Sequence, residues 1–207
     1  MKKLTLVFTL FFLCVGASSS LFASSIAVTA PTSFSEGGLD GVWGWQFTSS
    51  QDITVTSLGA FDKNGDGLFA DIQMGLWNES GVLLGSSVAN AGTSNLLEAG
   101  YRWAPLSSSV NLLANTSYRI GAHMTLDNAI HSGSGHVFDS LITHTGNSVF
   151  KVGSFGFPDS ISTTNPVKYL NASFKFETSS PIPEPGTMLL FGVGLMGLAG
   201  VGRRRKK

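Results

Sequence analysis

Apolar and polar residues alternate along short runs through the middle of the chain. Trp43, Trp45 and Phe47 occupy every second position, and Ile72 and Met74 repeat this spacing further along. Successive side chains of a β-strand point to opposite faces of a sheet, so a period of two is typical of strands. The runs that predict strands are 43–47, 53–56, 72–77, 82–88, 101–106, 110–113, 118–124, 136–143, 149–155 and 172–176.

Turn-forming residues separate these runs at regular spacing. Asn64-Gly65, Asp66-Gly67 and Ser80-Gly81 are pairs that favour tight turns. No stretch between the strands keeps the apolar period of about 3.6 residues that marks an amphipathic helix. The pattern therefore predicts an all-β domain over residues 26–178, an antiparallel β-sandwich of jelly-roll or immunoglobulin-like kind.

The N-terminal end differs from the middle of the chain. Residues 1–23 combine Lys2 and Lys3 with an apolar run over 4–15 and then small residues, which is the layout of a secretory signal peptide. The apolar run is short for a permanent membrane helix, although a retained N-terminal anchor is the alternative. The residues after which signal peptidase could cut are Ala17, Ala23 and Ala27.

The C-terminal segment 179–207 has three parts in a fixed order. A proline-rich stretch is followed by an apolar run, expected as a transmembrane helix over 187–202, and by a basic tail over 203–207. The positive-inside rule places that tail in the cytoplasm, so the proline-rich stretch faces outward. Prolines cannot continue a helix, so we expect this stretch to be extended and open to a protease. Its key residues are Pro183, Glu184 and Pro185, and those of the tail are Arg203, Arg204 and Arg205.

These three parts together resemble the PEP-CTERM sorting signal, including Thr187 and the glycines Gly192 and Gly194 of the apolar run. The resemblance implies a Gram-negative bacterial host, recognition by a membrane exosortase, cleavage near the motif and delivery to the exterior. A plain tail anchor with incidental prolines is the alternative.

A second resemblance covers residues 53–122. The segments that carry it are Ile53–Gly59, Met74–Trp77, Gly100–Trp103 and Leu112–Ala122. They are similar to a β-sandwich domain of unknown function that recurs in exported bacterial proteins, often beside the same sorting tail. This resemblance implies an architecture but says nothing about activity.

Charge is unevenly spread along the chain. Twelve of the thirteen acidic residues but only six of the thirteen basic residues lie between positions 24 and 180, so the exported part is acidic. An acidic domain has no electrostatic footprint for nucleic acid. The single cysteine, Cys14, lies in the signal segment, so the domain must be held by packing without disulfides.

One loop has the oxygen-rich spacing of a calcium site. Asp62, Asn64 and Asp66 alternate before Gly67, and Asp71 lies close enough to complete a ligand set. The twelfth position of an EF-hand loop would be Gln73, which lacks the required carboxylate, so an EF-hand is excluded. A hairpin turn made of good turn formers is the alternative interpretation.

Other side chains with useful chemistry have no recognisable spacing. A group of histidines near a carboxylate could bind zinc or transfer protons, but surface or strand positions explain it equally well. The tryptophans could form a platform for sugars, although alternating tryptophans on strands are typical of a core. The residues concerned are His123, His131, His136, His144 and Asp139, and Trp43, Trp45, Trp77 and Trp103.

Together these observations predict a non-enzymatic surface or extracellular matrix protein that acts in adhesion or in contact with exopolysaccharide. Its role in a biofilm is implied by the sorting resemblance. A calcium- or carbohydrate-binding module is the alternative, and an exported hydrolase is a third. The expected partners are signal peptidase, exosortase and the membrane. No cofactor is expected, except calcium if the domain is a calcium-binding module.

Overall fold

The structure of the protein, a computed structural model, describes residues 24–37, 40–124, 130–162 and 168–178. Ser24–Ser179 form one compact unit. The predicted signal peptide, the predicted sorting segment and the side chain of His131 lie outside the described residues. In the described ranges, no helix has the length and apolar character needed to cross a membrane.

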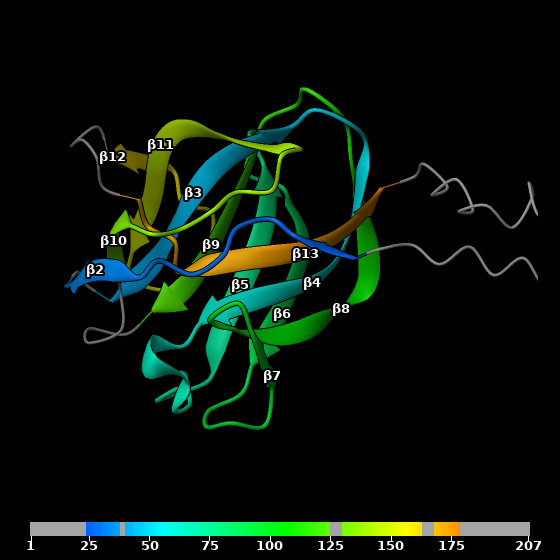
Figure 1. Ribbon diagram of the computed structural model, residues 1–207. Helices are drawn as coiled ribbons and strands as arrows, with labels where there is room; N and C mark the ends of the chain where they lie inside the picture. The colour runs from blue at the N-terminus through cyan, green and yellow to red at the C-terminus, as the bar shows by residue number, and fades with distance from the viewer. Residues whose placement is uncertain (1–23, 38–39, 125–129, 163–167, 179–207) are drawn as a thin grey trace, which may run out of the picture. The chain divides into compact units, whose positions relative to one another are not determined.

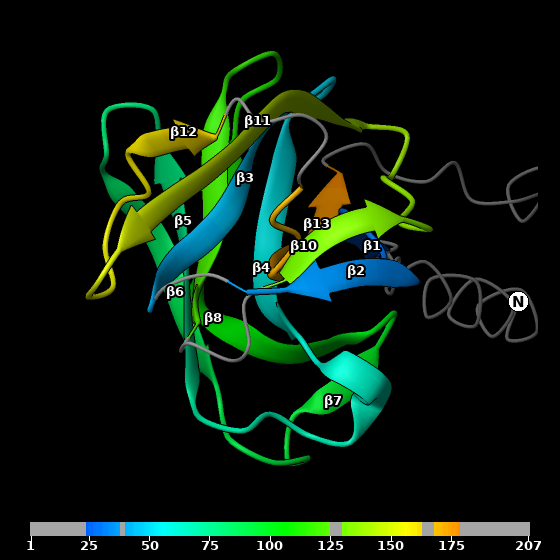
Figure 2. The same ribbon diagram turned by 90° about the vertical axis from the view of Figure 1, so that its left-hand side faces the viewer.

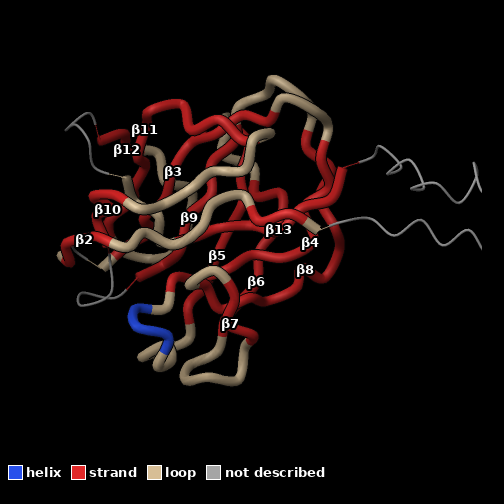
Figure 3. The backbone as a smooth tube through the Cα atoms, viewed as in Figure 1, coloured by secondary structure: helices blue, strands red, loops and turns tan. Residues whose placement is uncertain are grey.

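Two antiparallel sheets pack into a sandwich (Figure 1, Figure 2), which confirms the predicted fold class. The first sheet has the order β1 (Ser25–Ile26), β13 (Ala172–Thr178), β4 (Ile53–Phe61), β8 (Tyr101–Leu112) and β7 (Leu96–Glu98). The second has the order β12 (Ser160–Ser162), β11 (Ile142–Val152), β3 (Gly41–Ser49), β9 (Tyr118–Met124), β5 (Ile72–Asn78) and β6 (Leu83–Ala89). A separate pair is formed by β2 (Ser33–Glu36) and β10 (Ile130–Ser134), and the helical segment drawn in Figure 3 is the 3-10 turn η1 (Lys63–Gly65).

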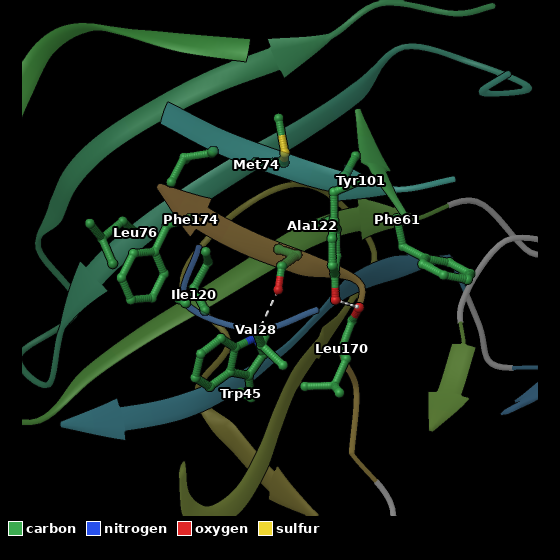
Figure 4. Packing of buried hydrophobic residues seen from close by; sticks show 14 of the residues in the cluster. Val28, Trp45, Phe61, Met74, Leu76, Tyr101, Ile120, Ala122, Leu170 and Phe174 are labelled. Atoms are coloured by element: carbon green, nitrogen blue, oxygen red, sulfur yellow. Dashed lines mark hydrogen bonds between the residues drawn. The ribbon is translucent and has the colours of Figure 1, made fainter. Parts of the chain in front are cut away.

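The core between the sheets is rich in aromatic side chains, and two of those labelled in Figure 4, Trp45 and Tyr101, make hydrogen bonds there. Trp45 on β3 is fully buried, and its indole Nε1–H donates to the carbonyl of Ala172 on β13 at 2.8 Å. Tyr101 is also fully buried, its hydroxyl donates to the Leu170 carbonyl at 3.0 Å, and burial raises the pKa of this phenol. Buried polar groups need such partners, so these bonds allow large aromatics to fill the core.

All four tryptophans are buried, with at most 6% of their surface exposed. The interpretation of Trp43, Trp45, Trp77 and Trp103 as a sugar platform is therefore wrong. The core interpretation is confirmed for Trp43, Trp45 and Trp103, whereas Trp77 is buried outside the core cluster. Trp43 stacks on Phe150 with ring centroids 5.4 Å apart, and Trp77 packs on Phe155 at the same separation.

Some predicted strand boundaries are wrong. The first part of the run 136–143, residues 136–141, is a loop that makes one isolated bridge, Val28 with Phe138, and β11 begins only at Ile142. Asp139 closes a turn there, because its side chain accepts the N–H of Leu141 at 2.9 Å and its carbonyl accepts that of Ile142 at 3.0 Å. The runs 101–106 and 110–113 form the single strand β8, whose pairing with β4 contains a register shift between Val55 and Ser57.

The chain enters and leaves this unit at the same end of the sandwich. β1 pairs with the last part of β13, with Ser25 opposite Phe176, and Thr178 lies opposite Ile53 at the start of β4. The other end of β4, Phe61, lies roughly 27 Å away at the usual rise of a strand. We call the end of the sandwich beyond Phe61 the far pole, where η1 is found (Figure 1).

Candidate functional site

A cavity of about 420 Å³ lies at the far pole, beside η1. Its size falls in the range of small-molecule binding pockets. The apolar part of its lining comes from Phe61, Leu68, Ile72 and Met124, at the ends of β4, β5 and β9 and in the loop between them. The polar lining and rim include Glu36, Lys63, Asn64 and Asp66, and the remaining aromatic is Phe69.

The loop beside the cavity is shaped by residues in left-handed backbone conformations. Asn64 and Gly65 have φ values of 66° and 73°, which asparagine and glycine tolerate best. The carboxylate of Asp62 accepts the N–H of Gly67 at 3.2 and 3.3 Å to its two oxygens, which closes the loop on itself. The sequence therefore forms a turn, but the predicted hairpin is wrong, because the loop joins β4 of the first sheet to β5 of the second.

A buried ion pair fastens this loop to the first sheet. Arg102 on β8 donates from Nε to Oδ2 of Asp62 at 2.7 Å, and the two side chains are 6% and 1% exposed. The remaining guanidinium nitrogens donate to the carbonyls of Gly65 at 2.9 Å, Asn95 at 2.9 Å and Thr93 at 3.2 Å. One arginine thus holds the η1 loop and the 93–95 loop in a fixed relation, which its planar fork of donors makes possible.

Backbone contacts fix the other side of the same loop. Leu68 and Gly92 exchange hydrogen bonds, Leu68 N–H to Gly92 O at 3.1 Å and Gly92 N–H to Leu68 O at 2.7 Å. Asp71 accepts the N–H of Ala91 at 2.8 Å, so its carboxylate supports the loop from outside the cavity.

The structure brings three of the four predicted calcium ligands to one cavity. Asp62, Asn64 and Asp66 line it, whereas Asp71 does not. Asp62 is already engaged by Arg102 and Gly67, and the described residues contain no group of three or more histidine, cysteine or acidic side chains that could hold a metal ion. Calcium binding at this loop therefore stays a prediction that the geometry does little to support.

The rim of the cavity contains two features that the motif did not point to. Glu36 on β2 forms an ion pair with Lys63 of η1, which joins the β2–β10 pair to the loop. Phe69 also lines the cavity although its side chain is 88% exposed. An apolar residue at this point of a polar turn was the one signal in the sequence that could have drawn attention to it.

The histidines predicted as a cluster are only partly together. His136 and His144 both pack on Phe138, with ring centroids 5.4 and 5.6 Å away, whereas His123 lies elsewhere and contacts Asp40 at 3.3 Å. Lys168 donates to Nε2 of His136 at 2.9 Å, and its positive charge makes this a poor place for a metal cation. His144 accepts the N–H of Gly146 through Nδ1 at 2.9 Å, while its buried Nε2 has no hydrogen-bond partner among the residues that the structure describes.

These surroundings make His144 sensitive to acid. Burial, the charge of Lys168 and the proximity of His136 lower the pKa of His144 to about 4, from 6.5 in the unfolded chain. The unfolded chain therefore binds the proton first as the pH falls, so the free energy of unfolding decreases between pH 6.5 and pH 4. We expect His144 to contribute a decrease of about 1–2 kcal/mol, less than the full linkage value because the ring is partly exposed.

Urea titrations at several pH values measure this slope. The variant His144→Phe should flatten it, while Thr143→Val, at an exposed position on the same strand, should leave it unchanged. An unchanged slope in His144→Phe would show that other groups carry the acid sensitivity.

Comparison with known proteins gives two matches that do not overlap. A family model described as "Domain of unknown function (DUF4082)" matches residues 22–170, and the model of the PEP-CTERM protein-sorting motif matches residues 181–206. The second match contains the predicted processing residues and basic tail, which lie outside the described part of the chain. No curated protein matches the sequence.

Proposed function

The chain belongs to the family described as Domain of unknown function (DUF4082), and from this premise we propose that its sandwich is a non-enzymatic binding module displayed outside a Gram-negative cell. The PEP-CTERM motif marks an exported protein that is anchored in the membrane before exosortase cleaves it. The proposed role after processing is adhesion through contact with exopolysaccharide, at the cell surface or in the biofilm matrix.

The position of the sorting motif relative to the fold carries this proposal. β13 ends at Thr178, and the motif match begins at residue 181. Cleavage near Pro183-Glu184-Pro185 would leave β13 whole, so the released domain keeps every strand of the sandwich. A processing site this close to the last strand suits a protein whose folded domain is the product to be delivered.

The N-terminal boundary narrows the choice of signal-peptidase sites. Ala27 is fully buried, and its N–H donates to the carbonyl of Phe174 at 2.9 Å. Cleavage after Ala27 would remove β1 from the edge of the first sheet, whereas cleavage after Ala17 or Ala23 would keep it. We therefore propose that signal peptidase cuts at one of the two earlier positions.

The chemistry of the far pole favours binding over catalysis. Hydrolysis of glycosides needs two free carboxyl groups that act as acid, base or nucleophile. Asp62 accepts hydrogen bonds from Arg102 and Gly67, so its role is to position the loop. The cavity supports a carbohydrate-binding module as the proposed function. A calcium-dependent binding module is the second candidate.

Replacing Glu184 tests the sorting step. In the host, Glu184→Ala should leave nearly all of the protein in the inner-membrane fraction with its basic tail attached, whereas the wild type should be found outside. Glu177→Ala is the matched control, because Glu177 is an acidic residue on β13 just before the motif. Release of Glu184→Ala at the wild-type level would show that the motif is not what the processing enzyme reads.

A further inference from the structure

We propose that the cavity at the far pole is a binding site for a neutral saccharide unit, with Phe69 as its stacking platform. This deepens the proposed function and depends on it only for where the domain is displayed. An exposed aromatic ring, open polar groups, the charges around the cavity and a rigid loop all favour such a ligand.

Phe69 is exposed beyond what folding explains. Its side chain is 88% exposed, yet it follows Leu68, which is buried and fixed by two backbone hydrogen bonds to Gly92. Contact between an aromatic ring and water is unfavourable, so the free energy falls when another apolar surface covers the ring. The C–H face of a pyranose ring is such a surface, and aromatic side chains are large and rigid enough to receive it.

Polar groups at the same rim are open to a ligand. Asn64 and Asp66 are exposed and line the cavity, and neither side chain makes a hydrogen bond within the described part of the chain. An amide and a carboxylate together supply the donors and acceptors that neighbouring sugar hydroxyls require. An apolar floor with a few convergent polar groups is typical of small-molecule sites.

The charges around the cavity favour a neutral ligand. Glu36 is paired with Lys63, and Asp62 is paired with Arg102, which leaves the carboxylate of Asp66 as the unbalanced charge of the lining. A uronic acid or a sulfated sugar would be repelled by this carboxylate and by the acidic domain as a whole. A neutral saccharide meets no such repulsion.

The site is held in place before any ligand arrives. The Arg102 fork, the Leu68–Gly92 pair and the Asp71–Ala91 bond all fix the loop. Little conformational entropy is therefore lost on binding, which benefits the weak contacts that sugars make. The cavity also lies roughly 27 Å from the strand ends where the chain enters and leaves the domain, so attachment through either end leaves its mouth open.

The test uses the mature protein collected from the host and polysaccharide purified from the host's own matrix, separated by anion exchange into neutral and anionic fractions. Binding is measured by depletion of the protein from solution at increasing polysaccharide concentration. We expect the wild type to bind the neutral fraction, and Phe69→Ala to bind it about tenfold more weakly or worse. Asp66→Ala should bind the neutral fraction severalfold more weakly, and excess chelator should leave wild-type binding unchanged.

Leu113→Ala is the matched control, because Leu113 is 61% exposed and adjoins Leu112, whose partner Ile53 marks the opposite end of the sandwich. Wild-type affinity in Phe69→Ala, or stronger binding to the anionic fraction, would overturn the proposal. Loss of binding with chelator would also overturn it and indicate a calcium-dependent site. If neither fraction binds while Glu184-dependent release is intact, the saccharide site fails and the sorting function stands. If Glu184-dependent release fails but Phe69-dependent binding persists, the sorting function fails and the saccharide site stands.

Discussion

Replacing Asp62 with alanine should lower the free energy of unfolding by about 3–5 kcal/mol. The substitution leaves the guanidinium of Arg102 buried and unpaired, since Arg102 is only 5% exposed and donates to Asp62 at 2.7 Å. It also removes the acceptor for the N–H of Gly67, which closes the η1 loop. Urea denaturation of the purified domain measures the change as a shift of the transition midpoint.

Two controls separate the buried pair from charge effects in general. Glu36→Ala breaks an ion pair whose side chains are 39% and 51% exposed, and exposed pairs contribute at most about 1 kcal/mol. In the double variant Asp62→Leu with Arg102→Met, much of the lost stability should return because no charge is left buried. A loss below 1 kcal/mol in Asp62→Ala would contradict the role given to this pair.

Replacing Trp45 with alanine should lower the free energy of unfolding by about 3–5 kcal/mol as well. Trp45 is fully buried, packs against Phe47, Phe138 and Phe174 with centroids 5.2 to 6.1 Å away, and donates to Ala172 across the two sheets at 2.8 Å. The truncation therefore opens a cavity and removes a hydrogen bond between the sheets. The same denaturation experiment checks it, with near-ultraviolet circular dichroism to report the packing of the aromatics.

Conservative and remote variants complete this test. Trp45→Phe keeps most of the ring volume but loses the indole N–H. Its free energy of unfolding should therefore lie between those of the wild type and Trp45→Ala. Phe69→Ala should change stability by no more than about 0.5 kcal/mol, since its ring is 88% exposed. A Trp45→Ala variant as stable as Phe69→Ala would mean that the aromatic cluster does not hold the sheets together.

The part of the fold predictable from sequence was the part governed by local alternation. Trp43, Trp45 and Phe47 repeat every second residue, and β3 with its neighbours follows from that spacing. β1, β7 and β12 escaped prediction because two or three residues are too few to show a period. The loop over 136–141 has the composition of a strand, but Asp139 forms a turn there through hydrogen bonds that alternation does not reveal.

The candidate site was predictable only as far as its own loop. The spacing of Asp62, Asn64 and Asp66 marked a turn with open oxygen atoms, and the structure places all three at one cavity. Arg102 lies 40 residues from Asp62 along the chain, so their pairing depends on the register of β4 with β8. Glu36 joins the site from β2, which comes well before η1 in the sequence, and no local pattern connects the two.

The intact mass of the native protein, collected from the exterior of its host, tests the central claim most directly. We expect one species that has lost both ends, beginning after Ala17 or Ala23 and ending near Pro183-Glu184-Pro185, with all of Ser24–Thr178 retained. A mature species that keeps Arg203, Arg204 and Arg205 would contradict it, because the protein would then be a permanently membrane-anchored domain and not a product released by exosortase.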